Sequence, residues 1–547
     1  MKRLARIGFL AFVVAYIAAV AGPAGSVEPA RQNAFTQPHV LRFGDIGDVT
    51  SLNPMFATEL ALSRMSSLTM AFLFKYDHNN NPIPELTTVV PTMANGGIGK
   101  DGKTITYHLR KGVKWSDGVP FDADDVVFTT KMILDPKTNV VGRDGWDHIT
   151  KIDEPDKYTV IFHLSAPYSP FMPTFFGSAG ANPAIVPKHL LEHSNNVNTD
   201  PYNSKPVGTG PFRYVEWRRG DRVIMEPNPY YFRGLPKLKR IEYRIVPNRD
   251  TLLTQLQTGE VDLWPNAARA YYDAHGFLGL KGFTILRQAS FGYGHLDFNV
   301  DRPMLKDPRV RRALALAIDR QTLKDKVGRH LGIIQDGVES PASPYFDKAI
   351  RTSPFDPKKA NKLLDLAGWI RGTDGIRAKD GKRLSLELVS NTGSPDTDTQ
   401  IELIRGWWKD IGVLLERHDY TPPMLFALQQ NGGIIYGGKF DVVIFAWYLG
   451  AGGDLSNIYG CREFPPKGQN SLRWCNQKAN DAMDAFKLTY DVGQQKKYDA
   501  IVQEAIAADV PTYVLQVNED LFPHNTDLQN FHPNAVTAFD DFMNVDI

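Results

Sequence analysis

The sequence predicts a mixed α/β protein in which strands and helices alternate along the chain, with longer excursions that are typical of inserted domains. Two observations support this prediction. Runs with an apolar residue at every second position alternate with runs in which apolar residues recur at helical spacing. In addition, 547 residues are too many for one hydrophobic core, so two or three domains are expected.

The first part of the chain shows both kinds of pattern. The expected elements are a strand over residues 40–43, a helix over 60–73, a turn over 77–84, and strands over 104–109 and 158–164 with a helix over 123–133 between them. Asp122 is the expected N-cap of that last helix, because the acidic residues Asp124 and Asp125 follow in its first turn, where the helix dipole favours them.

The middle of the chain, residues 207–262, is rich in turn signals. A glycine turn and a later break rich in Pro, Gly and Asn separate three alternating runs, which predict strands over 212–217, 223–226 and 241–246. Asp250 is the expected N-cap of the following helix, and Gly259 is expected to end it.

Two Asp-Pro pairs predict helix starts further along. Asp307-Pro308 and Asp356-Pro357 each combine an N-cap residue with a proline at the first helical position, and Gly368 is the expected stop of the second helix. The remaining expected elements are a strand over 384–389, a helix over 401–411, and strands over 413–416 and 441–445.

The composition argues against a nucleic-acid-binding protein. The chain is 42% hydrophobic and 22% charged, as in ordinary globular proteins, and its formal charge is +1. Residues 1–26 hold three basic and no acidic side chains, so the remainder carries a charge of −2. Proteins that bind nucleic acid carry a basic excess gathered on one face.

The N-terminus predicts export. Residues 1–6 are basic, residues 7–21 are apolar, and Ala24-Gly25-Ser26 offers small residues for cleavage before Val27, so residues 1–26 are interpreted as a signal peptide. A retained membrane anchor is the alternative, although the apolar run is short of the ~20 residues that span a bilayer. No cysteine follows the apolar run to carry a lipid, so a free periplasmic protein is expected.

The two cysteines, Cys461 and Cys475, are expected to form a disulfide. They lie fourteen residues apart, and an exported chain meets oxidising conditions. Closing a loop of this size stabilises the fold by ~3 kcal/mol in the chain-entropy model. Two buried free thiols are the alternative.

Three segments closely resemble family 5 of the bacterial extracellular solute-binding proteins, the peptide- and nickel-type receptors of ABC importers. They are the Gly-Thr-Gly-Pro-Phe, Asn-Pro-x-Tyr and Gly-Glu-Val-Asp pieces within 207–262, the segment KGVKWSDG at 111–118, and the run LDFNVDRPMLKDPRVRRALALAIDRQTL that begins at Leu296. The resemblance covers nearly the whole mature chain, from residue 41 to about 517.

The resemblance implies a two-lobed periplasmic binding protein fold of type II (cluster C), in which one lobe carries an extra inserted domain and the lobes close over a ligand. The implied ranges are 27–75, 206–288 and 511–547 for lobe one, 76–205 for the inserted domain, and 289–510 for lobe two. It also implies a function: a monomeric, cofactor-free receptor that captures peptides in the periplasm and delivers them to an inner-membrane ABC permease.

One enzymatic pattern competes with this interpretation. Residues His189 to His193 match His-x-x-Glu-His, a zinc-hydrolase motif in which the two histidines share a metal and Glu192 acts as base. The match is short, and the segment around it resembles a non-catalytic element of the receptor family. The chain has no Walker loop, so it would depend on a partner for ATP hydrolysis, and we expect a receptor and not an enzyme.

The candidate ligand site lies at the end of the strand expected at 441–445. This strand leads Trp447, Tyr448 and Leu449 into a glycine-rich loop where backbone groups can approach a ligand closely. In related peptide receptors this strand end lines the cleft and a nearby Asp holds the peptide ammonium group. A core tryptophan is the alternative for Trp447.

The chain departs from the family pattern at two positions. The ammonium-binding Asp would fall at Ala451, and an Arg of some oligopeptide receptors is Ile444. Asp454 is therefore the candidate ammonium partner, with a loop cap as its alternative. If the ligand has no free ammonium group, an oligosaccharide, an opine-like conjugate or a blocked peptide is the alternative ligand.

Further ligand contacts follow from weaker parallels with the family. His418 is the nearest candidate for a nickel ligand, but its surroundings do not match the nickel-type motif, so no metal site is predicted. The candidates are Asp48 and Thr50 from lobe one, Tyr293 and Asn299 beside the hinge, and Asn391 and Thr392 after a lobe-two strand, each with a turn role as the alternative.

Overall fold

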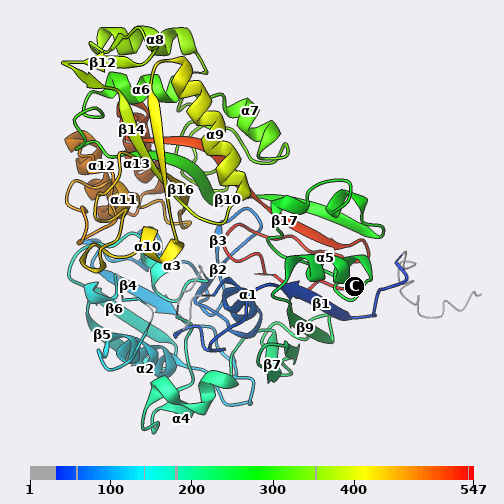
Figure 1. Cartoon of the computed structure of the whole chain (residues 1–547). Helices are drawn as coiled ribbons and strands as arrows, with labels where there is room; N and C mark the ends of the chain where they lie inside the picture. The colour runs from blue at the N-terminus through cyan, green and yellow to red at the C-terminus, as the bar shows by residue number, and fades with distance from the viewer. Residues whose placement is uncertain are drawn as a thin grey trace, which may run out of the picture.

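Two bodies, one above the other in Figure 1, are joined by the long strands β10 (Phe283–Phe298) and β17 (Thr512–Asn525). This computed structural model describes residues 33–547 apart from 57–58, 141, 144, 179–182, 352–353 and 540. The predicted signal peptide therefore lies outside the described residues. Within them, no helix combines the length and the apolar character that a membrane crossing requires.

The lower body contains a four-stranded sheet in the order β1-β9-β8-β7 and a three-stranded antiparallel sheet in the order β4-β6-β5. The second sheet has an apolar cluster of its own, with Trp115, Phe162 and Phe175 fully buried. The elements are β1 (Val40–Asp45), α1 (Leu60–Thr69), β2 (Phe74–Tyr76), β3 (Pro82–Pro84), β4 (Thr104–His108), α2 (Ala123–Leu134), β5 (Ile149–Asp156), β6 (Thr159–Leu164), α3 (Phe171–Thr174), α4 (Lys188–Leu191), β7 (Phe212–Arg218), β8 (Arg222–Pro227), β9 (Arg240–Ile245) and α5 (Arg249–Gln257).

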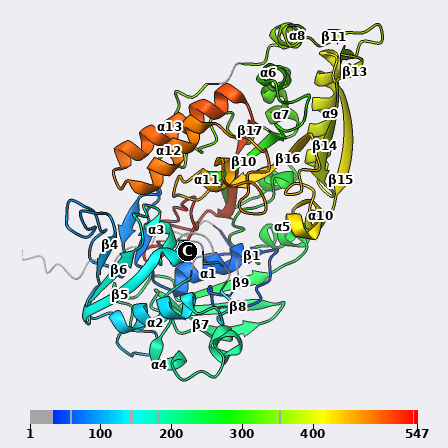
Figure 2. The ribbon, with the colours of Figure 1, turned by 90° about the vertical axis from the view of Figure 1, so that its left-hand side faces the viewer.

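The upper body is built on a five-stranded sheet in the order β15-β14-β16-β10-β17, in which β10 is antiparallel to both of its neighbours. Helices α12 and α13 lie side by side along this body (Figure 2). The elements are α6 (Pro308–Leu316), α7 (Arg320–Lys326), α8 (Pro357–Leu366), β11 (Ile370–Arg371), β12 (Arg377–Lys379), β13 (Lys382–Arg383), β14 (Ser385–Asn391), α9 (Pro395–Asp410), β15 (Leu414–Tyr420), α10 (Pro422–Leu425), β16 (Val442–Tyr448), α11 (Ser456–Tyr459), α12 (Gln477–Leu488) and α13 (Val492–Asp509).

The expected helix starts are confirmed at Asp122, Asp307 and Asp356, whose side chains accept hydrogen bonds from backbone N–H groups of the first helical turn. The expectation for Asp250 is wrong. Asn248 is the N-cap of α5, because its backbone is extended and its side chain accepts from the N–H of Thr251 at 2.9 Å. Asp250 lies in the first turn of that helix.

Helix α1 ends earlier than expected because the Gly-Thr-Gly-Pro turn packs against its last residue. A Cβ atom on Gly208 would lie 2.1 Å from the carbonyl oxygen of Thr69, and one on Gly210 would lie 2.5 Å from its carbonyl carbon. The N–H of Gly210 donates to that same oxygen at 3.0 Å. Glycines at both positions therefore let this turn close the end of the helix.

The two large sheets meet at Leu263. This residue bridges Phe43 of β1 on one side and His524 of β17 on the other. Next to it, the fully buried carboxylate of Asp262 accepts two hydrogen bonds from the Arg42 guanidinium, at 2.7 and 2.8 Å, and one from the backbone N–H of Arg42. The amide of Asn525 in β17 donates to the same carboxylate at 3.2 Å. Asp262 is the last residue of the Gly-Glu-Val-Asp piece.

Strands β10 and β17 are paired along most of their length, from Phe283 opposite Asn525 to Asp297 opposite Thr512. The register shifts between Ala289 and Tyr293, so that residues 290–292 of β10 form an irregular stretch. This interruption separates the part of β10 that pairs with residues 519–525 of β17, next to Asp262 of the lower body, from the part that pairs with β16 in the upper body. Such irregularities locally disrupt the ladder and increase its twist.

The mixed α/β, two-lobed fold expected from the sequence is confirmed, and so is the disulfide between Cys461 and Cys475. The exact ranges of the lobes and the inserted domain stay a prediction. The proposed boundary at 288/289 falls inside β10, which belongs to both bodies.

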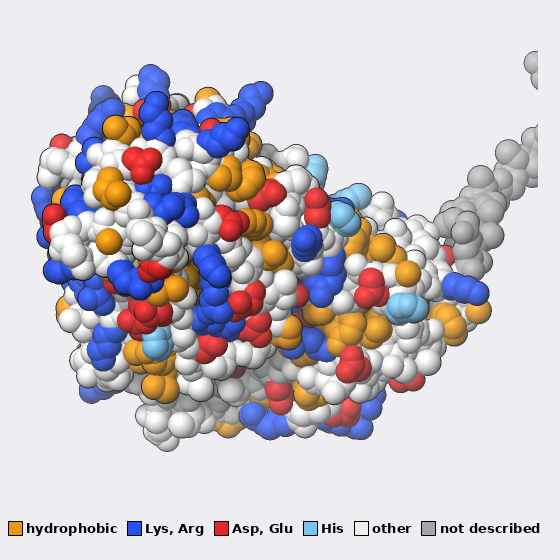
Figure 3. Space-filling model, turned by 45° about the horizontal axis from the view of Figure 1, so that its top comes forward, with side chains coloured by type: hydrophobic (Ala, Val, Ile, Leu, Met, Phe, Trp, Pro, Cys, Tyr) orange, Lys and Arg blue, Asp and Glu red, His pale blue; other side chains and the backbone are white. Residues whose placement is uncertain are grey.

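Charge is distributed unevenly over the surface. Figure 3 shows Lys and Arg side chains gathered at the end of the molecule that carries α8 and β12, with acidic side chains interspersed over the rest of this face. Exposed basic residues at this end are Lys358, Lys359, Lys362, Lys382 and Arg383. Other basic side chains are mixed with acidic ones over the rest of this face, so the basic residues do not form a continuous stripe.

Removing the Asp262 carboxylate should destabilise the whole chain. In the variant Asp262→Ala the Arg42 guanidinium is left buried without its partner, so we expect the free energy of unfolding to fall by about 3–5 kcal/mol. Urea unfolding measures this change. The control is Glu402→Ala, which removes an exposed partner of Arg405 and should cost less than about 1 kcal/mol. A loss at Asp262 no larger than that of the control would contradict the prediction.

Two buried acids in the upper body predict a pH dependence of stability. Glu339 and Asp499 are 0% and 2% exposed. Burial raises the pKa of Glu339, and burial together with the nearby Glu339 raises the pKa of Asp499. The folded chain therefore holds protons that the unfolded chain releases above its ordinary carboxyl pKa of about 4, so stability should fall as the pH rises from 5 to 8.

The variant Asp499→Asn tests this dependence. Its amide keeps an oxygen for the Gln503 side chain, which donates to Asp499, and adds a donor for the buried, unpartnered Gln503 Oε1. We expect the fall in unfolding free energy between pH 5 and pH 8 to be smaller in the variant than in the wild type. Equal pH slopes in the two proteins would show that this pair does not titrate as described.

Candidate functional site

A cavity of about 910 Å³ lies between the two bodies and is lined by side chains from both. The lower body contributes Leu60 and Arg64 of α1, together with Trp146, Tyr168 and Thr174 near the three-stranded sheet. The connecting strands contribute Phe291, Asp520 and Phe522, the end of β16 contributes Tyr448, and the loop after it contributes residues 449–451. This volume is within the range of about 300–1,000 Å³ that is typical of small-molecule sites.

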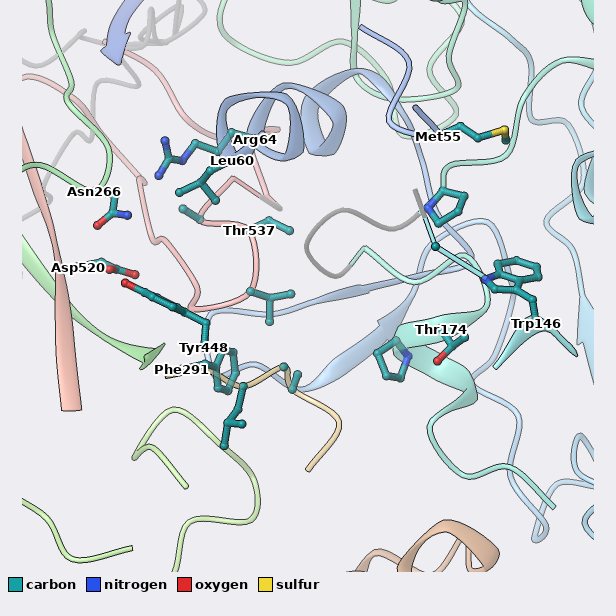
Figure 4. A pocket seen from close by; sticks show the side chains of 18 of the residues that line it. Met55, Leu60, Arg64, Trp146, Thr174, Asn266, Phe291, Tyr448, Asp520 and Thr537 are labelled. Carbon is teal, nitrogen blue, oxygen red and sulfur yellow. The ribbon is translucent and has the colours of Figure 1, made fainter. Parts of the chain in front are cut away.

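One end of the cavity is polar and carries its charge. Figure 4 shows Arg64, Asn266 and Asp520 gathered there with the ring of Tyr448. Arg64 and Asp520 are the two charged residues among the described residues that line the cavity. Burial raises the pKa of Asp520 to about 6, and the neighbouring cations Arg64 and Arg269 oppose this rise.

The two charged residues differ in their partners. The side chain of Arg64 is 3% exposed and forms an ion pair with Asp45 of β1, so its charge is already balanced. The carboxylate of Asp520 accepts no hydrogen bond and forms no ion pair within the described part of the chain. On the opposite face of the same strand, Glu519 is paired with Arg287 at 2.7 Å. Asp520 is therefore the cavity-lining carboxylate that is available to bind a cationic group of a ligand.

Tyr448 forms an aromatic wall of the cavity. Its side chain is 62% exposed, which is unusual for a tyrosine at the end of a strand in the middle of a sheet. It lies opposite Gly292 in the register of β16 and β10, where a Cβ atom would come within 2.6 Å of the ring. The absence of a side chain at Gly292 therefore lets the ring lie against β10.

The C-terminal segment closes another side of the cavity. Residues 536–538 line it, and the side-chain oxygen of Asn534 accepts hydrogen bonds from their three backbone N–H groups at 2.9 to 3.2 Å. The hydroxyl of Thr537 is buried and makes no hydrogen bond within the described residues. Trp146 and Thr174 lie at the end of the cavity away from Asp520 (Figure 4).

Two of the ligand contacts expected from the sequence line this cavity, namely Tyr448 and Leu449. Ala451 lines it as well, at the position where the family pattern has an Asp. Ile444 is 3% exposed and belongs to the core of the upper body.

Trp447 and Asp454 lie outside the lining of the cavity. Trp447 packs between His295 and Phe445, with its indole N–H buried and unpartnered within the described residues. The carboxylate of Asp454 accepts a hydrogen bond from the N–H of Ser456 at 2.9 Å, as a loop cap does. A ligand contact by either residue stays a prediction.

The two candidates beside the hinge are also buried away from the cavity lining. The hydroxyl of Tyr293 is 2.8 Å from that of Tyr459, and Tyr293 is 0% exposed. The Asn299 amide donates to the carbonyl oxygens of Gly438 and Phe440. Both side chains have structural partners, and their contact with a ligand remains untested.

The remaining candidates lie near the ends of strands. Thr50 donates its hydroxyl to Glu59 at 2.7 Å, and the Asp48 carboxylate accepts from the N–H of Val49. Asn391 is the last residue of β14 and Thr392 follows it, and the N–H of Thr392 donates to the carbonyl of Tyr420 at 2.9 Å. None of these four is among the cavity-lining residues that the structure describes.

The structure does not assemble the His-x-x-Glu-His pattern into a metal site. Helix α4 ends at Leu191, so it does not carry both histidines on one face. His189 lies 2.9 Å from Asp117, whereas the side chain of His193 is 90% exposed. Across the described ranges, no group of three or more His, Cys, Asp or Glu side chains is arranged to hold a metal ion.

Comparison with known proteins identifies the family. The sequence model for bacterial extracellular solute-binding proteins, family 5 Middle, matches residues 88–463. The chain belongs to this family. Its members are transport receptors and not enzymes, so the zinc-hydrolase hypothesis does not hold.

Individual relatives are similar in sequence to this chain over most of its length. Oligopeptide-binding protein AppA of Bacillus subtilis (strain 168) is 29% identical over 97% of this chain and 97% of its own length. Protein XP55 of Streptomyces lividans is 32% identical over 80% of this chain and 76% of its own. The structure of AppA from Bacillus subtilis in complex with a nonapeptide covers 93% of this chain and 99% of that one, with a TM-score of 0.72 and 25% identity.

The residues that give this cavity its charge were not among those expected from the sequence. Asp520 and Phe522 share a face of β17 because alternate residues of a strand point the same way, but the expected elements stopped before this strand. Arg64 lies on a helix that was expected, yet its direction depends on how α1 packs on β1. The apolar run over residues 513–515 and the apolar residues 521–523, on either side of the acidic residues 519 and 520, are the signal that identifies this strand.

Proposed function

We propose that this protein is the periplasmic receptor of an ABC importer and that it binds short peptides in the cavity between its two bodies. Ligand contacts on both bodies stabilise the closed form, and an inner-membrane permease recognises that form. The proposal includes export through residues 1–26 and action as a monomer.

The observation that supports this proposal best is the position of the cavity. It lies at the interruption of β10 and β17, and both bodies and both strands line it. A ligand in this cavity contacts both bodies, and the position of the bodies relative to each other changes when the protein closes. The relative whose solved structure holds a nonapeptide shares this fold over 93% of the chain.

A melting-shift experiment tests the ligand class. The protein without residues 1–26 is unfolded and refolded to remove bound ligand, and is then heated with defined di- to nonapeptides, with oligosaccharides and with opines. A ligand at a hundred times its Kd adds ~2.7 kcal/mol of stability, which shifts the melting temperature measurably. We expect peptides to stabilise the protein. Stabilisation by a sugar or an opine alone would refute the peptide assignment.

Tyr448 is part of the proposed binding surface, and Gly292 determines where its ring lies. In Gly292→Ala the new methyl group would clash with the ring and push it into the cavity. We expect the Kd for a bound peptide to rise about threefold to tenfold, comparable to Tyr448→Ala, since aromatic contacts contribute about 0.5–1.5 kcal/mol.

Isothermal titration calorimetry with one peptide from the melting screen measures this change. The control is Gly406→Ala in α9, because a Cβ atom at Gly406 meets nothing within 4 Å, its φ is not in the left-handed region, and it lies outside the cavity lining. Equal affinity of the wild type and Gly292→Ala would show that the ring position does not matter for binding.

A further inference from the structure

We infer that Asp520 is the anchor for the positively charged amino terminus of the bound peptide, in place of the loop aspartate that the family pattern has at Ala451. This inference rests on the proposed peptide-binding function. It assigns the recognition of charge to a connecting strand instead of the loop after β16.

The side chains on β17 point in directions that favour this role for Asp520. Asp520 and Phe522 both line the cavity, whereas Glu519 lies between Asn518 and Asp520 on the other face of the strand and is paired with Arg287. The paired carboxylate of Glu519 thus points away from the cavity, and the unpaired carboxylate of Asp520 points toward it.

The charges around the cavity favour the same role, because its arginines have partners and Asp520 has none in the described part of the chain. Arg64 is paired with Asp45, and the guanidinium of Arg269 donates to Asn518 at 2.6 Å. Asp520 has no such partner within the described residues. A carboxylate that is largely withdrawn from water is costly unless a cation or several donors meet it. A ligand ammonium group supplies both, because it carries a positive charge and three N–H donors.

Asp454, the other candidate for this role, is less suited to it. Asp454 already accepts the N–H of Ser456, and it borders a separate small cavity with Leu455, Met483 and Asp499. Ala451 lines the main cavity but has no polar side chain. Of the three positions, only Asp520 combines a carboxylate, an open acceptor and a place on the cavity wall.

The surroundings of Asp520 also suit an amino terminus. The groups that face it from neighbouring elements are Arg64 of α1, Arg269 in the segment 269–271 and Tyr448 of β16. In Figure 4 the carboxylate lies beside Asn266 and Tyr448, with open space toward Thr537 and Trp146. A peptide that begins at Asp520 therefore has room to extend toward the far end of the cavity.

A comparison of free and blocked peptides tests the inference on the wild-type protein. Isothermal titration calorimetry is performed with a peptide that stabilises the protein and with the same peptide acetylated at its amino terminus. We expect acetylation to weaken binding about tenfold to a hundredfold, because it removes a charged hydrogen bond. Equal affinities would overturn the inference while leaving the proposed function intact.

The variants then locate the anchor. In Asp520→Asn, a nearly isosteric change, we expect the free peptide to bind as weakly as the acetylated one. In Asp454→Asn and Glu519→Gln the difference between the two peptides should persist. Loss of the difference in Asp454→Asn, or its persistence in Asp520→Asn, would overturn the assignment. If no peptide binds to the wild type, the proposed function fails and this inference fails with it.

A pH series provides a readout that does not depend on any variant. Between pH 6.5 and pH 5 the peptide amine stays protonated, since its ordinary pKa is about 7.7–8.0. The raised pKa of Asp520, about 6, means that the free protein takes up a proton in this range. Affinity for the free peptide should therefore fall with pH, by up to about tenfold, while affinity for the acetylated peptide stays constant. Parallel pH curves for the two peptides would contradict the inference.

Discussion

The contact between Asp262 and Arg42 is the constraint on which the arrangement of the two bodies depends. Asp262 follows α5 in the chain, Arg42 lies in β1, and Asn525 at the end of β17 binds the same carboxylate. Leu263 then bridges β1 and β17 directly. Segments around residues 42, 262 and 525, which lie far apart in the sequence, are thus joined by hydrogen bonds at one point. These contacts fix the position of the end of β17 relative to β1 in the lower body. Because these groups are buried and mutually satisfied, the contact specifies geometry as well as stability.

Buried charge is used in two different ways in this molecule. At Asp262 the carboxylate is surrounded by donors, and the result is a rigid junction. At Asp520 the carboxylate faces a cavity with no partner within the described residues, and burial raises its pKa to about 6. Stability alone would favour neutralising such a group. Unpaired polar groups of this kind are common at functional sites, where a ligand supplies the missing partner.

Sequence patterns predicted most local structure where the determining residues are neighbours, although the N-cap of α5 is Asn248 and not Asp250. Helix starts at Asp122, Asp307 and Asp356 depend on contacts within one turn, and all three were predictable. The end of α1 was not, because Gly208 and Gly210 lie far along the chain from Thr69. The candidate site followed the same rule. Tyr448 and Leu449 were found through a local strand-and-glycine pattern, whereas Asp520 reaches the cavity only through the long pairing of β10 with β17.

The interruption of the ladder at residues 290–292 of β10 has a mechanical consequence. We expect motion between the bodies to concentrate where the strands are least regularly hydrogen-bonded, so that this stretch acts as the hinge. Phe291 and Asp520 lie close to it and should move little when the bodies rotate, whereas the remote end that carries α8 and β12 should move further. The ligand site therefore lies at the hinge between the two bodies. A small rotation at the ligand site should accordingly produce a large displacement of the surface at the far end of the upper body.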